Sequence, residues 1–236
     1  AWLREDPELF VIGVEPIVAN VNILTDTLAT SHDFEIRERF LLIPCAVGAE
    51  SGELPFFFTN DPGQASFLRP IIHSFAEVSP VVVETVDRII DLIEPGRFAK
   101  VDYIKTDCQG WDHNVLLGSL GTLHSTAIVT IEAPTNAYDL RKGESLKDSA
   151  ELLENLGFTW INRPSRIKTI LARALRPLIE KSSALSSMVE KAALAPSAAQ
   201  RNVSVLDPTF VNSRFSSQVH SLSLIHISEP TRQAEI

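Results

Sequence analysis

The chain has 236 residues, of which 44% are hydrophobic and 22% charged, so it is long enough for one sizeable domain with an ordinary core. Its formal net charge of -9 argues against a nucleic-acid surface, since binding phosphate groups needs a concentrated basic patch. No apolar run reaches the roughly 18 residues that a membrane-spanning helix requires. The two cysteines stand far apart, which favours a reducing, cytoplasmic compartment over a disulfide framework or a zinc site.

Compact apolar runs in the first part of the chain predict buried strands at 10–16, 39–47 and 53–59, with a short helix at 20–28. The turn signal Asn60-Asp-Pro-Gly63 opens a region that we expect to be irregular up to residue 84. Thr85 is a predicted N-cap, because the apolar residues after it recur at helical spacing: Val86, Ile89, Ile90 and Ile93.

The second part continues the alternation of strands and helices. It predicts strands at 101–107, 127–132, 158–162 and 202–211, and helices at 115–120 and 145–156, the latter closed by Gly157. A helical segment at about 165–200, basic at its start, is interpreted as an insertion: a solvated surface element, a lid over the acceptor, or a patch for an anionic surface. The alternation predicts an α/β fold with a mostly parallel sheet and helices on both faces.

The stretch from Val101 to Asp112 carries the most chemistry. Strand side chains alternate between faces, so Lys105 and Asp107 share one face near the carboxyl end of their strand. Ligands bind at that edge in open α/β sheets. The alternative is a lysine and an aspartate that satisfy each other at the surface.

Five motifs, in order and spacing, resemble those of the FkbM-type S-adenosylmethionine-dependent methyltransferases. They are Val11-Ile-Gly-Val-Glu-Pro16, Cys45-Ala-Val-Gly-Ala-Glu-Ser-Gly52, Asp102-Tyr-Ile-Lys-Thr-Asp-Cys-Gln-Gly110, Val129-Thr-Ile-Glu-Ala133 and Asp207-Pro-Thr-Phe-Val-Asn212. The resemblance spans roughly residues 9–215 without the insertion. It implies a Rossmann-like class I methyltransferase fold, S-adenosylmethionine as cofactor, and O-methylation of a hydroxyl on a sugar or secondary metabolite. The expected partner is thus a small-molecule or glycan acceptor.

The same resemblance implies roles for individual residues. Glu15 would accept hydrogen bonds from the cofactor ribose, since two vicinal hydroxyls match a bidentate carboxylate. Ala46 and Val47 would flank the adenine. Asp107 would be the general base or a clamp on the acceptor hydroxyl, and Lys105 would keep Asp107 ionised or orient the acceptor.

Gln109 and Glu132 would bind the acceptor. Gln109 and Asp112 both stand where relatives often carry glutamate, which leaves the identity of the acceptor open. The acceptor-binding loops follow the strands, and loop specificity cannot be derived from one sequence.

Two other classes of function compete with this one. A non-catalytic Rossmann-like domain that binds a nucleotide or glycan would use the same strand ends. A nicotinamide-dependent oxidoreductase would also place an acid at the end of a strand to bind ribose, but the sequence shows no second nucleotide-binding half.

The ends of the chain carry two further expectations. Relatives have a first strand and a glycine-rich turn that we do not find before Trp2, so we expect a domain truncated at its N-terminus, spanning 1–220 and binding S-adenosylmethionine weakly. Residues 222–236 resemble the translation of a transposon-based sequencing adapter, so 221–236 is predicted to be a non-native tail.

Overall fold

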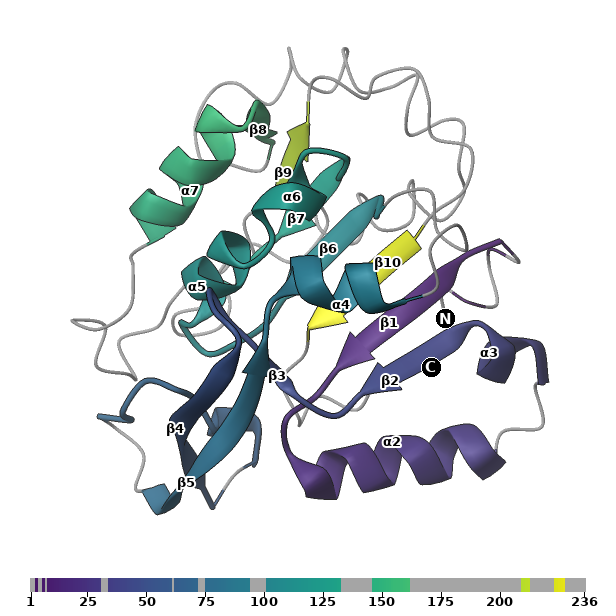
Figure 1. Cartoon of the computed structure of the whole chain (residues 1–236), viewed down its shortest axis with the longest axis vertical. Helices are drawn as coiled ribbons and strands as arrows, with labels where there is room; N and C mark the ends of the chain where they lie inside the picture. Colours follow the sequence, from purple (N-terminus) through teal and green to yellow (C-terminus); the bar gives the residue numbers. More distant parts are fainter. Residues whose placement is uncertain are drawn as a thin grey trace, which may run out of the picture.

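The computed structural model describes residues 3, 6, 8–30, 34–60, 62–71, 75–93, 101–132, 146–161, 209–212 and 223–227. The insertion predicted at about 165–200 lies outside these residues. Figure 1 shows a mixed α/β protein, with one large sheet and a smaller sheet beside it. The expected combination of sheets and helices is therefore confirmed.

The large sheet has seven strands and mixed pairing. Their order is β2 (Phe40–Ile43), β1 (Phe10–Val14), β10 (Ser223–Ile227), β6 (Tyr103–Thr106), β7 (Ile128–Thr130), β9 (Thr209–Asn212) and β8 (Phe158–Trp160). Neighbours from β2 to β7 pair parallel, whereas β9 pairs antiparallel with both β7 and β8. The sequence predicted a mostly parallel sheet, and the antiparallel pairing of β9 departs from that prediction.

Strand β10 lies inside the large sheet, between β1 and β6, although residues 221–236 were predicted to lie outside the domain. It pairs parallel with β1 on one side and β6 on the other, and Ile227 lies opposite both Val14 and Thr106. Without it, the facing edges of β1 and β6 would leave backbone N–H and C=O groups unpaired inside the sheet, which is costly. The strand therefore completes the sheet, while its adapter origin stays a prediction.

The helices include those predicted at 20–28, after Thr85 and at 145–156, with changed bounds, and also short ones at 34–38 and 62–64 that the sequence did not predict. They are α2 (Val18–Thr30), α3 (Phe34–Glu38), the short 3-10 helix η1 (Pro62–Gln64), α4 (Val86–Leu92), α5 (Asp112–Leu117), α6 (Leu120–Leu123) and α7 (Leu146–Asn155). Figure 1 shows α2 beside the β2 end of the sheet and α7 beside the β8 end. The side chain of Thr85 accepts a hydrogen bond from the backbone N–H of Arg88, which confirms the predicted N-cap.

One buried apolar cluster joins α4, α5, α6 and α7 to the large sheet. Its fully buried members include Ile12, Ile104, Leu116, Leu123 and Leu153. Packing of amphipathic helices onto a sheet in this way supplies the main free energy of folding. This cluster joins only α4, α5, α6 and α7 to the sheet. The arrangement of helices on both faces of the sheet therefore stays a prediction.

The sequence prediction was wrong in three places. The strand expected at 39–47 breaks at Pro44-Cys45 into β2 and β3 (Ala46–Val47), and β3 joins a second sheet of order β3-β5-β4 with β5 (Phe75–Glu84) and β4 (Gly52–Thr59). Strand β5 lies in the region expected to be irregular, and its Pro80 faces Pro55 of β4. Proline removes a backbone donor and weakens the strand signal. The single helix expected at 115–120 is two helices.

Gly118, between α5 and α6, lies against the backbone of the turn after β3. A Cβ added at Gly118 would come 2.0 Å from the carbonyl oxygen of Gly48, so one of the two segments would have to move. We expect Gly118→Ala to lower the free energy of unfolding by about 1–3 kcal/mol, the usual cost of overpacking. Urea denaturation measures this, with Gly52→Ala as control because a Cβ there meets nothing within 4 Å. Equal stability of the two variants would contradict the contact.

Candidate functional site

A pocket with a cavity volume of about 40 Å³ opens where β1, β3 and β6 end, beside the start of α5. The predicted site residues Glu15, Ala46, Val47 and Asp107 all line it. They come from three separate strand ends, so the large and small sheets together bring them into one place. Among the described residues that line the pocket, the predicted residues Lys105, Gln109 and Glu132 do not occur.

Glu15 follows the last residue of β1 and is almost completely buried, with 1% of its surface exposed. Its Oε1 accepts hydrogen bonds from the backbone N–H of Ile17 at 2.7 Å and from Nδ2 of Asn20 at 3.4 Å. Burial raises the pKa of the Glu15 carboxyl to about 7, although these two hydrogen bonds partly offset the effect. A buried carboxyl beside a pocket costs stability when it is ionised, which is typical of functional sites.

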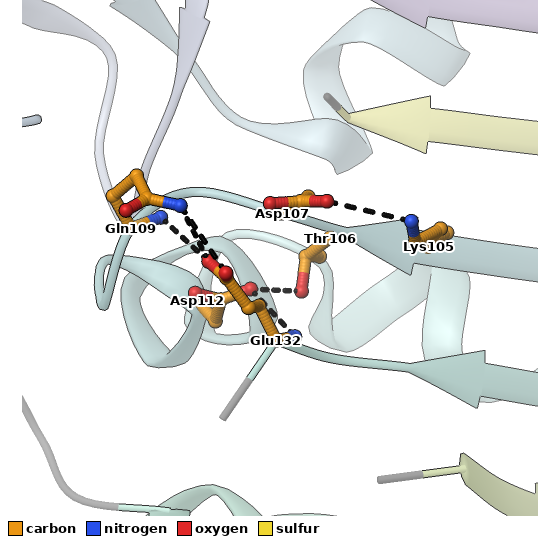
Figure 2. Close-up of polar contacts among 6 residues, drawn as sticks. All are labelled: Lys105, Thr106, Asp107, Gln109, Asp112 and Glu132. Carbon is orange, nitrogen blue, oxygen red and sulfur yellow. Dashed lines mark hydrogen bonds and ion pairs between the residues drawn. The ribbon is translucent and has the colours of Figure 1, made fainter. Parts of the chain in front are cut away.

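Lys105 and Asp107 form an ion pair at the end of β6. The distance from Lys105 Nζ to Asp107 Oδ2 is 3.4 Å, and the two side chains are 23% and 21% exposed (Figure 2). The other carboxylate oxygen, Asp107 Oδ1, is buried and has no hydrogen-bond partner among the described residues. The two side chains therefore pair with each other in a partly buried position rather than at the surface, and Asp107 also lines the pocket.

Gln109 and Glu132 lie together, from the turn after β6 and the end of β7. The Glu132 carboxylate accepts hydrogen bonds from the backbone N–H of Gln109 at 3.2 Å and from its Nε2 at 2.9 and 3.2 Å. Figure 2 shows this contact as separate from the Lys105–Asp107 pair. The two residues therefore contact each other in the protein, and their role toward an acceptor stays a prediction.

Asp112, the first residue of α5, is a buried acid whose contacts the sequence did not reveal. Its Oδ1 accepts hydrogen bonds from the hydroxyl of Thr106 and from the backbone N–H of Glu132, the latter at 3.3 Å. Burial raises its pKa to about 6; the Thr106 hydrogen bond lowers the pKa and the nearby charge of Asp107 raises it. Asp112 thereby ties the ends of β6 and β7 together (Figure 2).

Aromatic side chains form one wall of the pocket. The ring centroid of Phe67 lies 4.8 Å from that of Phe56, in an edge-to-face arrangement, and 5.0 Å from that of Trp111. Phe56 and Phe67 belong to a second apolar cluster with Ile17 and Ala65, which the small sheet brings against the end of β1. The three consecutive phenylalanines at 56–58 predict a well-packed strand. No local sequence pattern indicates that this region packs near Trp111.

Both cysteines line the pocket, and neither is a reactive thiol. Burial raises the pKa of Cys45 to about 11, with a smaller contribution from the charge of Glu84. Burial also raises the pKa of Cys108 well above its usual value, and the charge of Asp112 adds to the effect. Because both thiols stay protonated near neutral pH, they add apolar surface rather than nucleophiles.

The described lining of the pocket contains two carboxyl groups and no lysine or arginine. Such a lining suits a neutral or cationic ligand and disfavours a phosphate. The described residues include no group of histidine, cysteine or acidic side chains placed to hold a metal ion. In the same part of the chain, no helix is long and apolar enough to cross a membrane.

Comparison with known proteins gives one match. A family model described as the methyltransferase FkbM domain matches residues 3–159, a range that contains every residue discussed in this section. No curated protein matches the chain. No solved structure matches it either.

Proposed function

Because the chain belongs to the FkbM-type methyltransferase family, we propose that it transfers a methyl group from S-adenosylmethionine to a hydroxyl of a sugar or secondary metabolite. The supporting observation is the single pocket in which Glu15, Ala46, Val47 and Asp107 meet. We also propose that the mixed sheet is a variant of the Rossmann-like class I fold, and that the protein works in the cytoplasm.

The residues of the pocket fit S-adenosylmethionine chemically. The Glu15 carboxylate would accept hydrogen bonds from the vicinal ribose hydroxyls, and Ala46 and Val47 would lie against the adenine ring. Acidic side chains without a basic partner in the lining tolerate a positively charged sulfonium better than a phosphate. When bound, S-adenosylmethionine supplies an electrophilic methyl group that leaves its sulfur as a neutral thioether.

Asp107 is the residue that we place at the acceptor hydroxyl. Its carboxylate takes the proton that the hydroxyl loses as the oxygen becomes methylated, so charge does not build up on the oxygen. Lys105 Nζ, at 3.4 Å from Asp107 Oδ2, would hold the carboxylate in a fixed orientation toward the acceptor. The buried Oδ1, with no partner among the described residues, is the oxygen available for this contact.

A transfer assay with methyl-labelled S-adenosylmethionine tests the proposal. Candidate acceptors are sugars and secondary metabolites that carry a free hydroxyl, and the matched controls are the same compounds in deoxy form. We expect label in the hydroxyl compounds only, with one S-adenosylhomocysteine released per methyl group. Label in amines or carboxylates, or cofactor binding without any transfer, would contradict methylation of a hydroxyl, and the second result would favour a non-catalytic binding domain.

A further inference from the structure

The turn after β6 has an unusual backbone. Gln109 has a φ of 51° and Gly110 a φ of 87°, so two successive residues are in the left-handed region. Glycine adopts this conformation readily, but a glutamine side chain does not, and glutamine is not among the residues that tolerate it best. The turn therefore depends on contacts from outside.

Two distant segments supply those contacts. Glu132, at the end of β7, accepts hydrogen bonds from both the backbone N–H and the side-chain Nε2 of Gln109. Ser66, from the loop between β4 and β5, donates its hydroxyl to the carbonyl oxygen of Gln109 at 3.2 Å. Gln109 is only 5% exposed, so these contacts hold it on both sides of its backbone.

Glu132 is itself fixed in place. Its backbone N–H donates to the carbonyl oxygen of Thr106 at 3.2 Å and to Oδ1 of Asp112 at 3.3 Å. The carboxylate thus extends from a point where β6, β7 and α5 are joined, as Figure 2 shows. A strand end held in this way gives the turn a rigid support.

Residues directly before and directly after the turn line the pocket. Asp107 and Cys108 precede Gln109 and line the pocket, and Trp111 follows it and packs on Phe67. Glu132 does not line the pocket but contacts the residue in the middle of this segment. A change at Glu132 would therefore reach the pocket through Gln109.

We propose that Glu132 is a positioning residue, which holds the Gln109–Gly110 turn so that Asp107 and Trp111 stay in the pocket wall, rather than a residue that binds the acceptor. The proposal rests on the proposed function, because it assigns Glu132 a part in building that same site. The shape of the pocket without ligand then depends on Glu132, a side chain that does not line the pocket.

Trp111 reports on the turn without any ligand. In a chain in which Trp2 and Trp160 are replaced by phenylalanine, Trp111 is the only tryptophan left of three. We expect Glu132→Ala to shift its fluorescence to the red and to increase its quenching by acrylamide. Glu132→Gln keeps an oxygen acceptor for Gln109 and should restore most of the native emission. Glu151→Ala, an exposed glutamate on α7, is the matched control and should change nothing.

A second reporter separates a local effect from a general loss of structure. A chain with Trp160 as its only tryptophan reports on β8, where that ring packs 5.3 Å from Phe210. We expect Glu132→Ala to leave the Trp160 emission unchanged. Unchanged emission of Trp111 would overturn the proposal, and so would equal shifts at Trp111 and Trp160, since Glu132 would then be a general structural residue.

Cofactor binding provides a readout that acceptor binding would not move. We expect Glu132→Ala to weaken S-adenosylmethionine binding about tenfold, the loss of a hydrogen bond to a charged group, in the absence of acceptor. Native affinity with only a raised KM for the acceptor would overturn the proposal. If the parent chain binds no S-adenosylmethionine, the proposed function fails, while a shift confined to Trp111 still establishes the positioning role.

Discussion

Replacement of Asp107 by asparagine is expected to lower the turnover number about 10²- to 10⁴-fold, the usual contribution of a general base. The amide has the shape of the carboxylate but cannot take a proton from the acceptor hydroxyl. Because the pocket keeps its shape, we expect the binding free energy of S-adenosylmethionine to change little. Its affinity should stay within a factor of about three of the parent value. Steady-state kinetics with an acceptor found by the transfer assay measure both quantities.

The matched control is Asp91→Asn, an exposed acid on α4 that is not part of the pocket lining. It should leave both the turnover number and the cofactor affinity unchanged. A raised KM with native turnover in Asp107→Asn would make Asp107 a clamp on the acceptor, and native values of both would remove it from the reaction.

Replacement of Glu15 by glutamine is expected to stabilise the unliganded chain at alkaline pH. The pKa of Glu15 rises from 4.5 to about 7 on folding, so the folded state binds this proton more tightly than the unfolded state. Between these two pH values the free energy of unfolding therefore falls as the pH rises, and the penalty is complete above about pH 7. At about 1.36 kcal/mol per pKa unit, the gain from glutamine is at most about 3 kcal/mol.

The same substitution is expected to weaken S-adenosylmethionine binding about 10- to 100-fold, because charged hydrogen bonds to the ribose become neutral ones. Binding also favours the ionised carboxylate, so the affinity of the parent should fall as the pH drops below the Glu15 pKa of about 7. In Glu15→Gln this pH dependence should be lost. Calorimetric titration at several pH values measures both effects.

Urea denaturation of the parent and of Glu15→Gln, on either side of the Glu15 pKa, measures the stability difference. We expect a difference at alkaline pH that disappears below the unfolded-state pKa of 4.5, since the carboxyl is then protonated in both states. Asp112, whose pKa burial raises to about 6, contributes with the same sign in both proteins and cancels in the comparison. A loss of stability in Glu15→Gln at every pH would contradict the account.

Local patterns in the sequence were enough to place the strands that carry the site. The apolar runs before Glu15 and Asp107 predict β1 and β6, and both acids lie beyond the last residue of those strands. The caps at Thr85 and Gly157 are also local, and the φ of 93° at Gly157 fits its place after α7. These features depend on neighbours in sequence, so one sequence contains their signal.

Features that depend on distant partners could not be predicted. Strand β5 is stabilised by pairing with β4 rather than by its own composition, and β10 takes its place between two strands that lie far from it in the chain. In the site, the contact of Phe67 with Trp111 and that of Ser66 with Gln109 join residues that are more than 40 positions apart. Tertiary packing determines such contacts, and the hydrophobic periodicity of the sequence does not indicate them.

The emission of Trp111 during titration with S-adenosylmethionine tests most directly whether the pocket is the cofactor site. Trp111 lines the pocket, whereas Trp160, on β8, is not part of the described lining. Chains that keep only Trp111 or only Trp160 report the change in emission at each position as the cofactor concentration rises. We predict a saturable change at Trp111 and none at Trp160, and we predict that Glu15→Gln shifts the change at Trp111 to higher cofactor concentrations. Cofactor bound by calorimetry while the Trp111 emission stays unchanged would contradict the site.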